Sequence, residues 1–505
     1  MKDFRLFFTS DLHGYFFPTD YTDSVEKSMG LFKLAPNMKK DGNTLLLDGG
    51  DTIQSSPFML YTNRLHFRPH PIAQVMNRVG YDYVTLGNHD FNMGLDELQA
   101  YLEGLDAVCL CANIRDRAGK LPIRPYAVHT LENGLRIGLV GLCTHYVSVW
   151  EKKETLEELI IEHPLAAGKR ALDALRGQCD VTVCLYHGGY ERDLESGKKL
   201  TDSEENLACR IADELDFDVL LTGHQHMTVP CVRIGHTVSL QPGARAKCYG
   251  RVTGTLDETT GEKRIVTALC PPAEKADDAL MGMLRPLETR VQEWLDTPKG
   301  HLNRALLPEE HLDMALHGSP IADFINLVQK NYTGAQISAT SLGNEVKGMG
   351  REVSIRDVVS SYVYSNTLLL LEITGAQLKR YLERCAEYFR LEVGHVAISD
   401  AFLHPKVEHY NYDFFSGLTY TIDLRNVPGE RVTDIQVNGK TAQPDEKYTL
   451  CVNNYRATGA GGYDVLKECK VLRDFQADVC DLIIAYVEEH PDIHVDDLHP
   501  LSVIY

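Results

Sequence analysis

Apolar and polar positions follow two alternating patterns in the first half of the chain. Apolar runs typical of buried strands occupy residues 5–9, 44–47, 83–86, 135–142, 181–186 and 219–222. Helical spacing occupies residues 71–79, 95–102, 166–176 and 203–215. Because strands that alternate with helices build layered sheets covered by helices, the pattern predicts an α/β catalytic domain over residues 1–273.

The pattern changes after residue 273. Apolar residues from Leu280 to Leu295 recur at helical spacing, with Pro286 inside the run, so we expect a kink there or the start of a second helix. We interpret residues 274–299 as a helical link between two domains, although a last helix of the first domain is nearly as good an interpretation.

Residues 300–505 have a different pattern. They open with helical stretches and continue with strand-like runs at residues 367–373, 418–424 and 449–452. A two-residue turn is predicted at Asn438-Gly439, a pair typical of tight hairpins. The second half therefore predicts an α+β domain, so that the whole chain is a two-domain α/β (α+β) protein.

Polar clusters directly follow the apolar runs of the first domain. They are Asp11-Leu-His13, Asp48-Gly-Gly-Asp51, Gly87-Asn-His-Asp90, His187 and Gly223-His-Gln-His226. Polar groups at buried strand ends must find partners, and α/β folds place their sites at the carboxyl ends of strands. We therefore predict that the five clusters meet around metal ions.

The side chains of these clusters suit divalent metals. Asp11 and His13 are two residues apart, so both point to the same side of an extended strand end. Asp51 follows two glycines that permit a tight turn, and its two oxygens could bridge two cations. The other candidate ligands are Asn88, His187, His224 and His226. Nitrogen and oxygen donors without thiolate suit Mn, Fe, Co or Zn at two sites rather than structural zinc.

Composition limits the partners. The chain has 505 residues and a formal charge of −20, which repels polymeric nucleic acid, although bound cations would still attract a small anion. No apolar run approaches the roughly 20 residues of a membrane span, so no membrane partner is expected. Thirteen scattered cysteines and an N-terminus without a visible signal sequence favour a cytoplasmic protein with free thiols, with a secreted form stripped of its leader as the alternative.

The motifs together resemble a known family. Ser10-Asp-Leu-His-Gly14 and the GGD, GNHD, His187-Gly-Gly and GHQH motifs resemble the calcineurin-like metallophosphoesterases. Asn453-Asn-Tyr-Arg-Ala-Thr-Gly-Ala-Gly-Gly-Tyr463 resembles the signature of the 5′-nucleotidase C-terminal domain. The nearest branch is the bacterial 2′,3′-cyclic-nucleotide 2′-phosphodiesterase/3′-nucleotidases. The resemblance implies an N-terminal four-layer α/β/β/α sandwich and a C-terminal α+β domain that recognises nucleosides.

The resemblance also implies roles for the cluster residues. One metal would be held by Asp11, His13, Asp51 and His226, and the other by Asp51, Asn88, His187 and His224. His89 would contact the phosphoryl group and protonate the leaving oxygen. Two cations about 3.5 to 4 Å apart activate water and shield the charge of an in-line displacement, so the expected activity is hydrolysis of a small nucleotide ester.

The sequence does not show which acidic residue, if any, orients the ring of His89. In the 5′-nucleotidase branch an aspartate stands three residues after this histidine, whereas this chain has Asn92. Either Asp90 or a distant acid assists His89, or His89 acts without an acid partner. The asparagine also occurs in the cyclic phosphodiesterase branch, which favours that branch.

Substrate contacts are expected in the second domain. Tyr455 matches the aromatic residue on which the family stacks the base, an interaction of about 1 to 3 kcal/mol per base. Tyr412 is expected as the second face, with Phe414 and Phe415 as alternatives. The remaining candidate contacts are Asn454 and Gly459. The turn at residues 459–462 lacks the acid of the family motif, and residues 342–345 lack the arginines of 5′-nucleotidases.

Other functions remain compatible with the same motifs. A second enzyme hypothesis is hydrolysis of UDP-sugars, other diphosphates or sulfur esters at the same metal site. A non-enzyme hypothesis is a nucleotide-binding protein with a vestigial site, which the complete ligand set disfavours. The sequence does not determine the physiological substrate, the metal or the oligomeric state.

Overall fold

A computed structural model describes residues 1–151, 153–199, 204–364, 366–392, 394–404 and 407–505. The chain forms two compact units, one of residues 1–20 and 24–292 and the other of residues 21–23 and 293–505. The division falls inside helix α9 (Asp278–Asp296), which continues through Pro286 as one helix. The alternative of a second helix starting at Pro286 is therefore wrong, and most of α9 belongs to the first unit.

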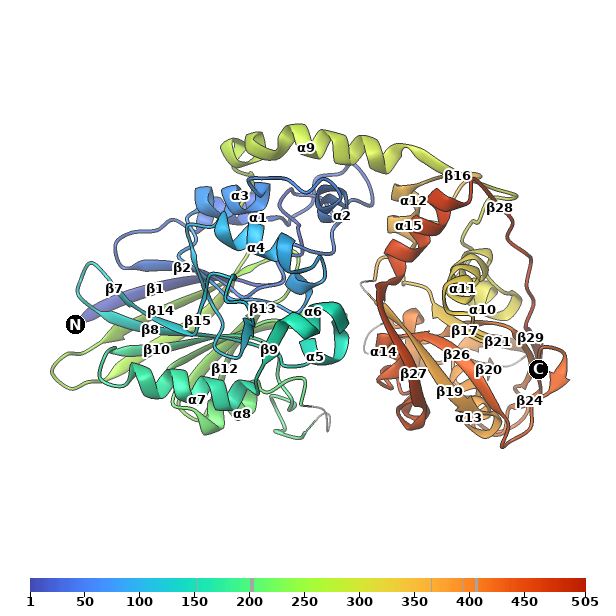
Figure 1. The fold of residues 1–505 in the computed structure, drawn as a ribbon. Helices are drawn as coiled ribbons and strands as arrows, with labels where there is room; N and C mark the ends of the chain where they lie inside the picture. The colour runs from blue at the N-terminus through green and yellow to red at the C-terminus, as the bar shows by residue number, and fades with distance from the viewer. Residues whose placement is uncertain (152, 200–203, 365, 393, 405–406) are drawn as a thin grey trace. The chain divides into compact units, whose positions relative to one another are not determined.

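Two sheets lie at the centre of the first unit (Figure 1). One has the order β15 (Lys263–Cys270), β14 (Tyr249–Leu256), β1 (Lys2–Thr9), β2 (Thr44–Asp48), β3 (Tyr83–Val84), β4 (Val108–Leu110) and β6 (Ile123–Arg124). The other has the order β12 (Thr228–Ile234), β13 (Thr237–Pro242), β11 (Val219–Thr222), β10 (Val181–His187), β8 (Arg136–Cys143) and β7 (Tyr126–Thr130).

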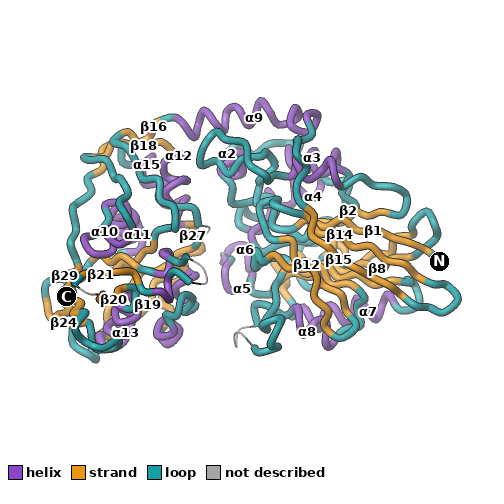
Figure 2. The backbone as a smooth tube through the Cα atoms, turned by 180° about the vertical axis from the view of Figure 1, so that it is seen from behind, coloured by secondary structure: helices purple, strands orange, loops and turns teal. Residues whose placement is uncertain are grey.

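Side chains alternate between the two faces of each strand, as strand geometry requires. Phe4, Leu6 and Phe8 of β1 pack with Val183 and Leu185 of β10 in a core between the two sheets. The opposite face of the second sheet packs against α7 (Pro164–Leu175) and α8 (Ala208–Glu214). Helices α3 (Pro71–Val79) and α4 (Leu95–Glu103) lie on the outer side of the first sheet (Figures 1 and 2). The predicted four-layer α/β/β/α sandwich is confirmed.

Shorter elements complete the first unit. They are α1 (Leu31–Leu34), α2 (Pro57–Asn63), the 3₁₀ turns Ala35–Asn37 and His89–Phe91, α5 (Val147–Trp150), α6 (Lys153–Glu158), and the paired strands β5 (Ile114–Asp116) and β9 (Leu159–Ile161). The helix predicted over residues 203–215 is α8, which begins at Ala208, while its predicted first residue, Ser203, lies outside the described residues.

The second unit is built on a five-stranded sheet. Its order is β22 (Asp413–Ser416), β17 (Ile337–Ser341), β26 (Lys447–Asn453), β19 (Thr367–Thr374) and β27 (Lys470–Asp478). Ile337 and Ala339 of β17 share a core with residues of α13 (Gly375–Ala386). Ser338, between them, donates a hydrogen bond to Asn326 of α11 (Pro320–Thr333) at 2.7 Å. The two helices therefore cover opposite faces of the sheet, which confirms the predicted α+β architecture.

Among the described residues, three smaller sheets and four further helices surround this core. The sheets are β25 (Lys440–Thr441), β24 (Val432–Val437), β23 (Leu418–Asp423) and β29 (Leu501–Ile504); β18 (Glu352–Ser354), β16 (Pro298–Leu302) and β28 (Asp492–Ile493); and β20 (Phe389–Glu392) with β21 (His395–Ile398). The helices are α10 (His311–His317), α12 (Ile355–Ser361), α14 (Asn454–Ala457) and α15 (Val479–Glu489). The remaining 3₁₀ turns are Asp400–Phe402, His409–Asn411 and Asp464–Glu468. Between β24 and β25 the turn residues Asn438 and Gly439 have φ of 49° and 74°, as the predicted two-residue hairpin requires.

Two further expectations concern thiols and membranes. All thirteen cysteines are free thiols in the structure. Within the described part of the chain, no helix combines the length and the apolar character that crossing a bilayer demands.

Candidate metal centre

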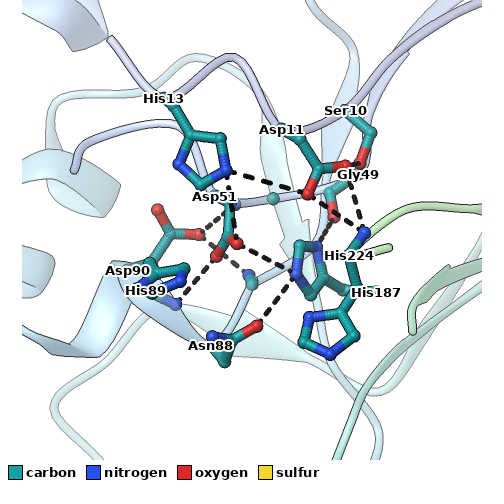
Figure 3. Close-up of polar contacts among 12 residues, drawn as sticks. Ser10, Asp11, His13, Gly49, Asp51, Asn88, His89, Asp90, His187 and His224 are labelled. Atoms are coloured by element: carbon teal, nitrogen blue, oxygen red, sulfur yellow. Dashed lines mark hydrogen bonds and ion pairs between the residues drawn. The ribbon is translucent and has the colours of Figure 1, made fainter. Parts of the chain in front are cut away.

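The five clusters predicted from the sequence lie at the carboxyl ends of neighbouring strands. Strands β1, β2 and β3 are parallel neighbours in the first sheet, and β10 and β11 are parallel neighbours in the second. The loops that follow these strands therefore emerge on the same side of each sheet, and their polar side chains converge (Figure 3).

Backbone contacts hold two of these loops together. The N–H of Asp11 donates to the carbonyl of Gly50 at 2.9 Å, and the N–H of His13 donates to the carbonyl of Asp51 at 2.8 Å. Gly50 has φ of 89°, and a Cβ there would lie 2.2 Å from the amide nitrogen of Gly87. Only glycine fits this position, which explains the second glycine of the Gly-Gly pair before Asp51.

Asp11, His13 and His226 form one group of possible ligands. The Nε2 atoms of His13 and His226 are 2.9 Å apart. Asp11 Oδ1 lies 3.5 Å from His226 Nε2 and 4.0 Å from His13 Nε2. Asp11 and His13 are buried, whereas the side chain of His226 is 42% exposed. The group therefore has two buried members, Asp11 and His13, and one member, His226, that faces solvent.

Asp51, Asn88 and His187 form a second convergence, in which Asp11 also takes part. His187 Nε2 lies 3.2 Å from both Asp51 Oδ2 and Asn88 Oδ1. Its Nδ1 donates to the carbonyl of Gly49 at 2.7 Å, so in the neutral ring Nε2 carries a lone pair. Asp51 Oδ2 is also 3.9 Å from His13 Nε2. Asp51 therefore faces His13 of the first group as well as His187 of the second, while Asp11 belongs to both groups, and a bridging role for Asp51 stays a prediction.

The electrostatics of the centre favour a bound cation. Burial opposes ionisation of both carboxylates, but the neighbouring histidines outweigh it: the pKa of Asp11 falls to about 2 and that of Asp51 falls well below its usual value. Burial lowers the pKa of His13 to about 3, so its ring stays neutral. For His187 burial acts in the same direction, yet Asp51 and Asp11 raise the pKa to about 10. Three acceptor atoms therefore meet, namely Nε2 of His187, Oδ2 of Asp51 and Oδ1 of Asn88. A proton on Nε2 or a metal ion between them satisfies all three. The donor set therefore fits divalent metals.

His224 lies beside this centre with a partner that the sequence did not reveal. Its ring is 5.4 Å from the ring of His187, and its backbone N–H donates to Asp11. His224 Nε2 lies 2.8 Å from Glu205 Oε1, and hydrogen bonding to His224 lowers the pKa of Glu205 against the effect of burial. A carboxylate on one ring nitrogen commonly orients a metal-binding histidine. Glu205 follows no predicted strand, so no pattern indicated it.

His89 and Asp90 are neighbours with different surroundings. The N–H of His89 donates to Asp51 Oδ1 at 2.8 Å, and its ring Nδ1 lies 2.8 Å from Asn92 Oδ1. Asp90 is 2% exposed, and its two oxygens accept the four backbone N–H groups of Asp51, Thr52, Ile53 and Gly87 at 2.8 to 3.3 Å. The expected catalytic role of Asp90 is corrected: its carboxylate positions the loops that carry Asp51 and Asn88.

Of the expected nucleoside contacts, the structure leaves Asn454 and Tyr455 at the surface of the second unit and buries Gly459 and Tyr412. Tyr455 of α14 is 41% exposed, and Asn454, also exposed, accepts from the N–H of Thr367 at 3.2 Å. Gly459 follows this helix with φ of 81°. Tyr412 is 3% exposed, and its hydroxyl donates to the carbonyl of Ala315. Tyr412 is therefore a core residue and cannot offer a ring face to a base, which corrects that prediction.

Comparison with known proteins shows the family. The calcineurin-like phosphoesterase model matches residues 4–228, and the 5′-nucleotidase C-terminal domain model matches residues 300–468. The solved structure of a putative 5′-nucleotidase from Staphylococcus aureus, in complex with alpha-ketoglutarate, is 30% identical over 100% of both chains with a TM-score of 0.80. The chain belongs to the calcineurin-like phosphoesterases. This phosphoesterase carries a 5′-nucleotidase C-terminal domain, and its fold implies divalent metals and the chemistry of a phosphoric ester hydrolase.

Two curated relatives show the range of this phosphoesterase's neighbours. A trifunctional nucleotide phosphoesterase of Bacillus subtilis is 23% identical over 96% of this chain, which spans only 38% of that protein's length. A 2′,3′-cyclic-nucleotide 2′-phosphodiesterase/3′-nucleotidase of Yersinia enterocolitica is 24% identical over 90% of this chain and 80% of its own.

Proposed function

We propose that this phosphoesterase hydrolyses small nucleotide esters, as a 2′,3′-cyclic-nucleotide 2′-phosphodiesterase/3′-nucleotidase or a 5′-nucleotidase. The observation that carries the proposal is the convergence of Asp11, His13, Asp51, Asn88, His187 and His226 beside His89. The asparagine at residue 92 and the Yersinia relative favour the cyclic phosphodiesterase branch.

The proposal includes two divalent ions, Mn, Zn, Fe or Co, with Asp51 between them. When bound, the ions supply positive charge against the phosphoryl oxygens and activate the attacking water. Asp11, His13 and His226 would hold one ion, while Asn88, His187 and His224 would hold the other. The two carboxylates remain ionised at neutral pH because their pKa values are low.

His89 is the residue that acts on the ester in this proposal. Its backbone N–H is hydrogen-bonded to Asp51, and its ring centroid lies 5.6 Å from that of His13. The ring is therefore adjacent to the metal ligands without belonging to either ligand group. A donor in this place stabilises charge that develops on the phosphoryl group and supplies a proton to the leaving oxygen.

The second unit contributes base recognition in the same proposal, with Tyr455 as one stacking face. Tyr364 replaces Tyr412 as the candidate for the other face. Burial raises the pKa of Tyr364 to about 12, and both Tyr410 and Tyr455 lie close enough to add to this shift. The rings of Tyr364 and Tyr410 are 6.4 Å apart. These tyrosines were missed because no spacing in the sequence relates them to Tyr455.

A substrate panel tests the proposal. Chelator-treated protein is reloaded separately with Mn, Zn, Fe(II) and Co, and assayed with 2′,3′-cyclic, 3′- and 5′-nucleotides, UDP-glucose and p-nitrophenyl phosphate. We expect metal-dependent release of phosphate or nucleotide, fastest with the cyclic and 3′-nucleotides. Turnover of UDP-glucose alone would replace the proposed substrate class, and inactivity with every metal and ester would overturn the proposal.

A further inference from the structure

A chain of two hydrogen bonds connects His89 to a buried carboxylate that is remote in the sequence. His89 Nδ1 lies 2.8 Å from Asn92 Oδ1, and Asn92 Nδ2 donates to Glu151 Oε2 at 3.1 Å. Glu151 is 7% exposed and directly follows α5, 59 residues beyond Asn92. The carboxylate thus reaches His89 only through the side-chain amide.

The chemistry of the three groups fixes the direction of both hydrogen bonds. An ionised carboxylate only accepts, so the NH₂ group of Asn92 must face Glu151. The amide oxygen then faces the ring, and the ring must donate from Nδ1. With the amide reversed, its oxygen would meet a carboxylate oxygen and its NH₂ would meet His89. Glu151 therefore determines which nitrogen of His89 carries the fixed proton.

The fixed proton decides what the other nitrogen can do. With Nδ1–H held by Asn92, Nε2 is the atom that binds and releases a proton during a reaction. A reversed amide would donate to Nδ1 instead, so the proton on Nε2 would be the only one on the ring, and giving it up would leave an unfavourable imidazolate anion. Asp90 cannot take over this task, because four backbone N–H groups occupy its oxygens.

We propose that Glu151 is a positioning residue, which acts through Asn92 to hold His89 in the form that protonates the leaving oxygen at Nε2. This inference rests on the proposed hydrolytic function. As the water oxygen bonds to phosphorus, the bond from phosphorus to the leaving oxygen breaks. The leaving oxygen keeps the electron pair of that bond and takes the proton from Nε2. A proton released by the attacking water then restores His89.

The dependence on the leaving group distinguishes this role from a structural one. p-Nitrophenolate departs without a proton, whereas the sugar hydroxyl of a nucleotide needs one. Glu151→Gln keeps the size of the side chain but can accept or donate, so it no longer fixes the amide. We expect kcat for a 3′-nucleotide to fall about 10- to 100-fold, the range of partial loss of general acid catalysis, with KM, metal content and kcat for p-nitrophenyl phosphate little changed. Glu154→Gln, an exposed carboxylate of α6, is the matched control.

A second pair of variants tests the relay in the opposite direction. Asn92→Asp places a carboxylate directly on His89 Nδ1 but sets it against Glu151, where two like charges oppose each other. Adding Glu151→Gln removes that conflict. The same Glu151→Gln change should therefore lower nucleotide turnover in the native background and raise it in the N92D background.

Several results would overturn the inference. Equal losses on both esters in E151Q, with metal retained, would show a structural role, and unchanged turnover of both would show no role. If E151Q does not fold, N92D and N92D/E151Q provide the comparison alone, and turnover that does not rise on adding E151Q contradicts the relay. If the wild-type protein cleaves phosphate esters but no nucleotide, only the proposed function fails, and an alkyl phosphate replaces the 3′-nucleotide. A wild-type protein that cleaves no ester overturns both.

Discussion

Five of the seven predicted ligand residues have left-handed backbone conformations. Their φ angles lie between 48° and 71°, at Asp11, His13, Asp51, His224 and His226. For residues other than glycine this region costs about 1 to 2 kcal/mol each. The cost falls on the residues that turn their side chains into the centre, so the loops around them must offset it. The hydrogen bonds of Asp90 to Asp51, Thr52 and Ile53 are one such contribution.

His89 is the residue whose removal should separate catalysis from metal binding. His89→Ala should lower kcat for a nucleotide ester at least about 100-fold, since a positioned acid and charge stabiliser is removed. Bound metal should persist, because the His89 ring belongs to neither ligand group. Steady-state kinetics and metal analysis of the same sample check both parts.

His187→Ala is the control for that experiment, because it removes a nitrogen 3.2 Å from both Asp51 and Asn88. It should lose metal and activity together. A His89→Ala protein that also loses its metal would contradict the separation of His89 from the ligands.

Residue types and strand context were enough to predict that the candidate ligands converge, but not their hydrogen-bond partners. Each ligand follows a buried strand, and the order of strands in a parallel sheet brings the strand ends together. Asp90 and His89 are adjacent in the same motif, and no spacing shows that one side chain turns to the backbone and the other toward the centre. Glu151 and Glu205 reach the site from loops without a periodic pattern. The prediction that Tyr412 contacts the base was wrong for a related reason. Aromatic residues of strands are part of the core more often than they are binding faces.

At the scale of elements, the turn after α14 is held by a buried ion pair. Arg456 is 1% exposed, with Nε 2.7 Å from Asp413 Oδ2 and Nη2 2.9 Å from Asp413 Oδ1. Its Nη1 donates to the carbonyl of Ala460 at 2.9 Å, and the carbonyl of Gly461 accepts from Arg384. The arginine of the Asn-Asn-Tyr-Arg motif is thus a support for the helix that presents Tyr455.

Arg456→Met should destabilise the second unit by about 3 to 5 kcal/mol, because it leaves Asp413 buried without its cation. The hydroxyl of Tyr381 still donates to Asp413 at 2.6 Å, but it carries no charge. Adding Asp413→Asn removes the uncompensated charge, so the double variant should be more stable than R456M alone. Urea unfolding followed by circular dichroism measures the difference.

Arg473→Met provides the matched control for this pair. Arg473 is exposed on β27, with its guanidinium 4.5 Å from the ring of Phe475, and its loss should change stability by no more than about 0.5 kcal/mol. A double variant no more stable than R456M would show that the buried charge is not the cause.

One carboxyl group of α11, that of Asp323, should make the stability of the second unit depend on pH. Burial raises the pKa of Asp323 to about 7, and Asp497 adds to the rise, while the N–H of Leu498, Arg304 and His499 oppose it. Between pH 4 and 7 the folded state keeps a proton that the unfolded state has released, so wild-type stability falls as pH rises through this range. Asp323→Asn does not titrate. Its melting temperature relative to wild type should therefore increase from pH 4 to pH 7 and then level off, and a constant difference would contradict the assignment.

The lengths of the elements followed the apolar patterns closely, with differences at their ends. The predicted helix at residues 71–79 matches α3, whereas β3 ends at Val84, two residues before the predicted end. Beyond Val84 the chain turns toward Asn88, and apolar character alone does not show where pairing stops. Pro286 lies inside α9 because tertiary packing of one helix face outweighs the lost hydrogen bond.

For the whole molecule, the two units have separate cores and carry different parts of the proposed chemistry. The residues that converge on the metal centre all belong to the first unit, and the core of α13, β17 and β19 belongs to the second. The chain has a formal net charge of −20. Two of its negative charges, those of Asp11 and Asp51, are buried at the metal centre, where water is excluded. A cation bound there stabilises only the unit that holds its ligands.

Metal removal should therefore act on one of two unfolding transitions. A ligand present at about 1,000 times its Kd adds about 4 kcal/mol of stability, which for a unit of this size corresponds to a midpoint shift of roughly 10 °C. Chelation should lower the first unit's transition in differential scanning calorimetry by this order and leave the second unchanged, while adding back Mn should restore it. Asp51→Asn, which lacks the carboxylate that faces both ligand groups, should show a much smaller shift. Equal movement of both transitions would contradict this prediction, because it would mean that the ions also stabilise the second unit.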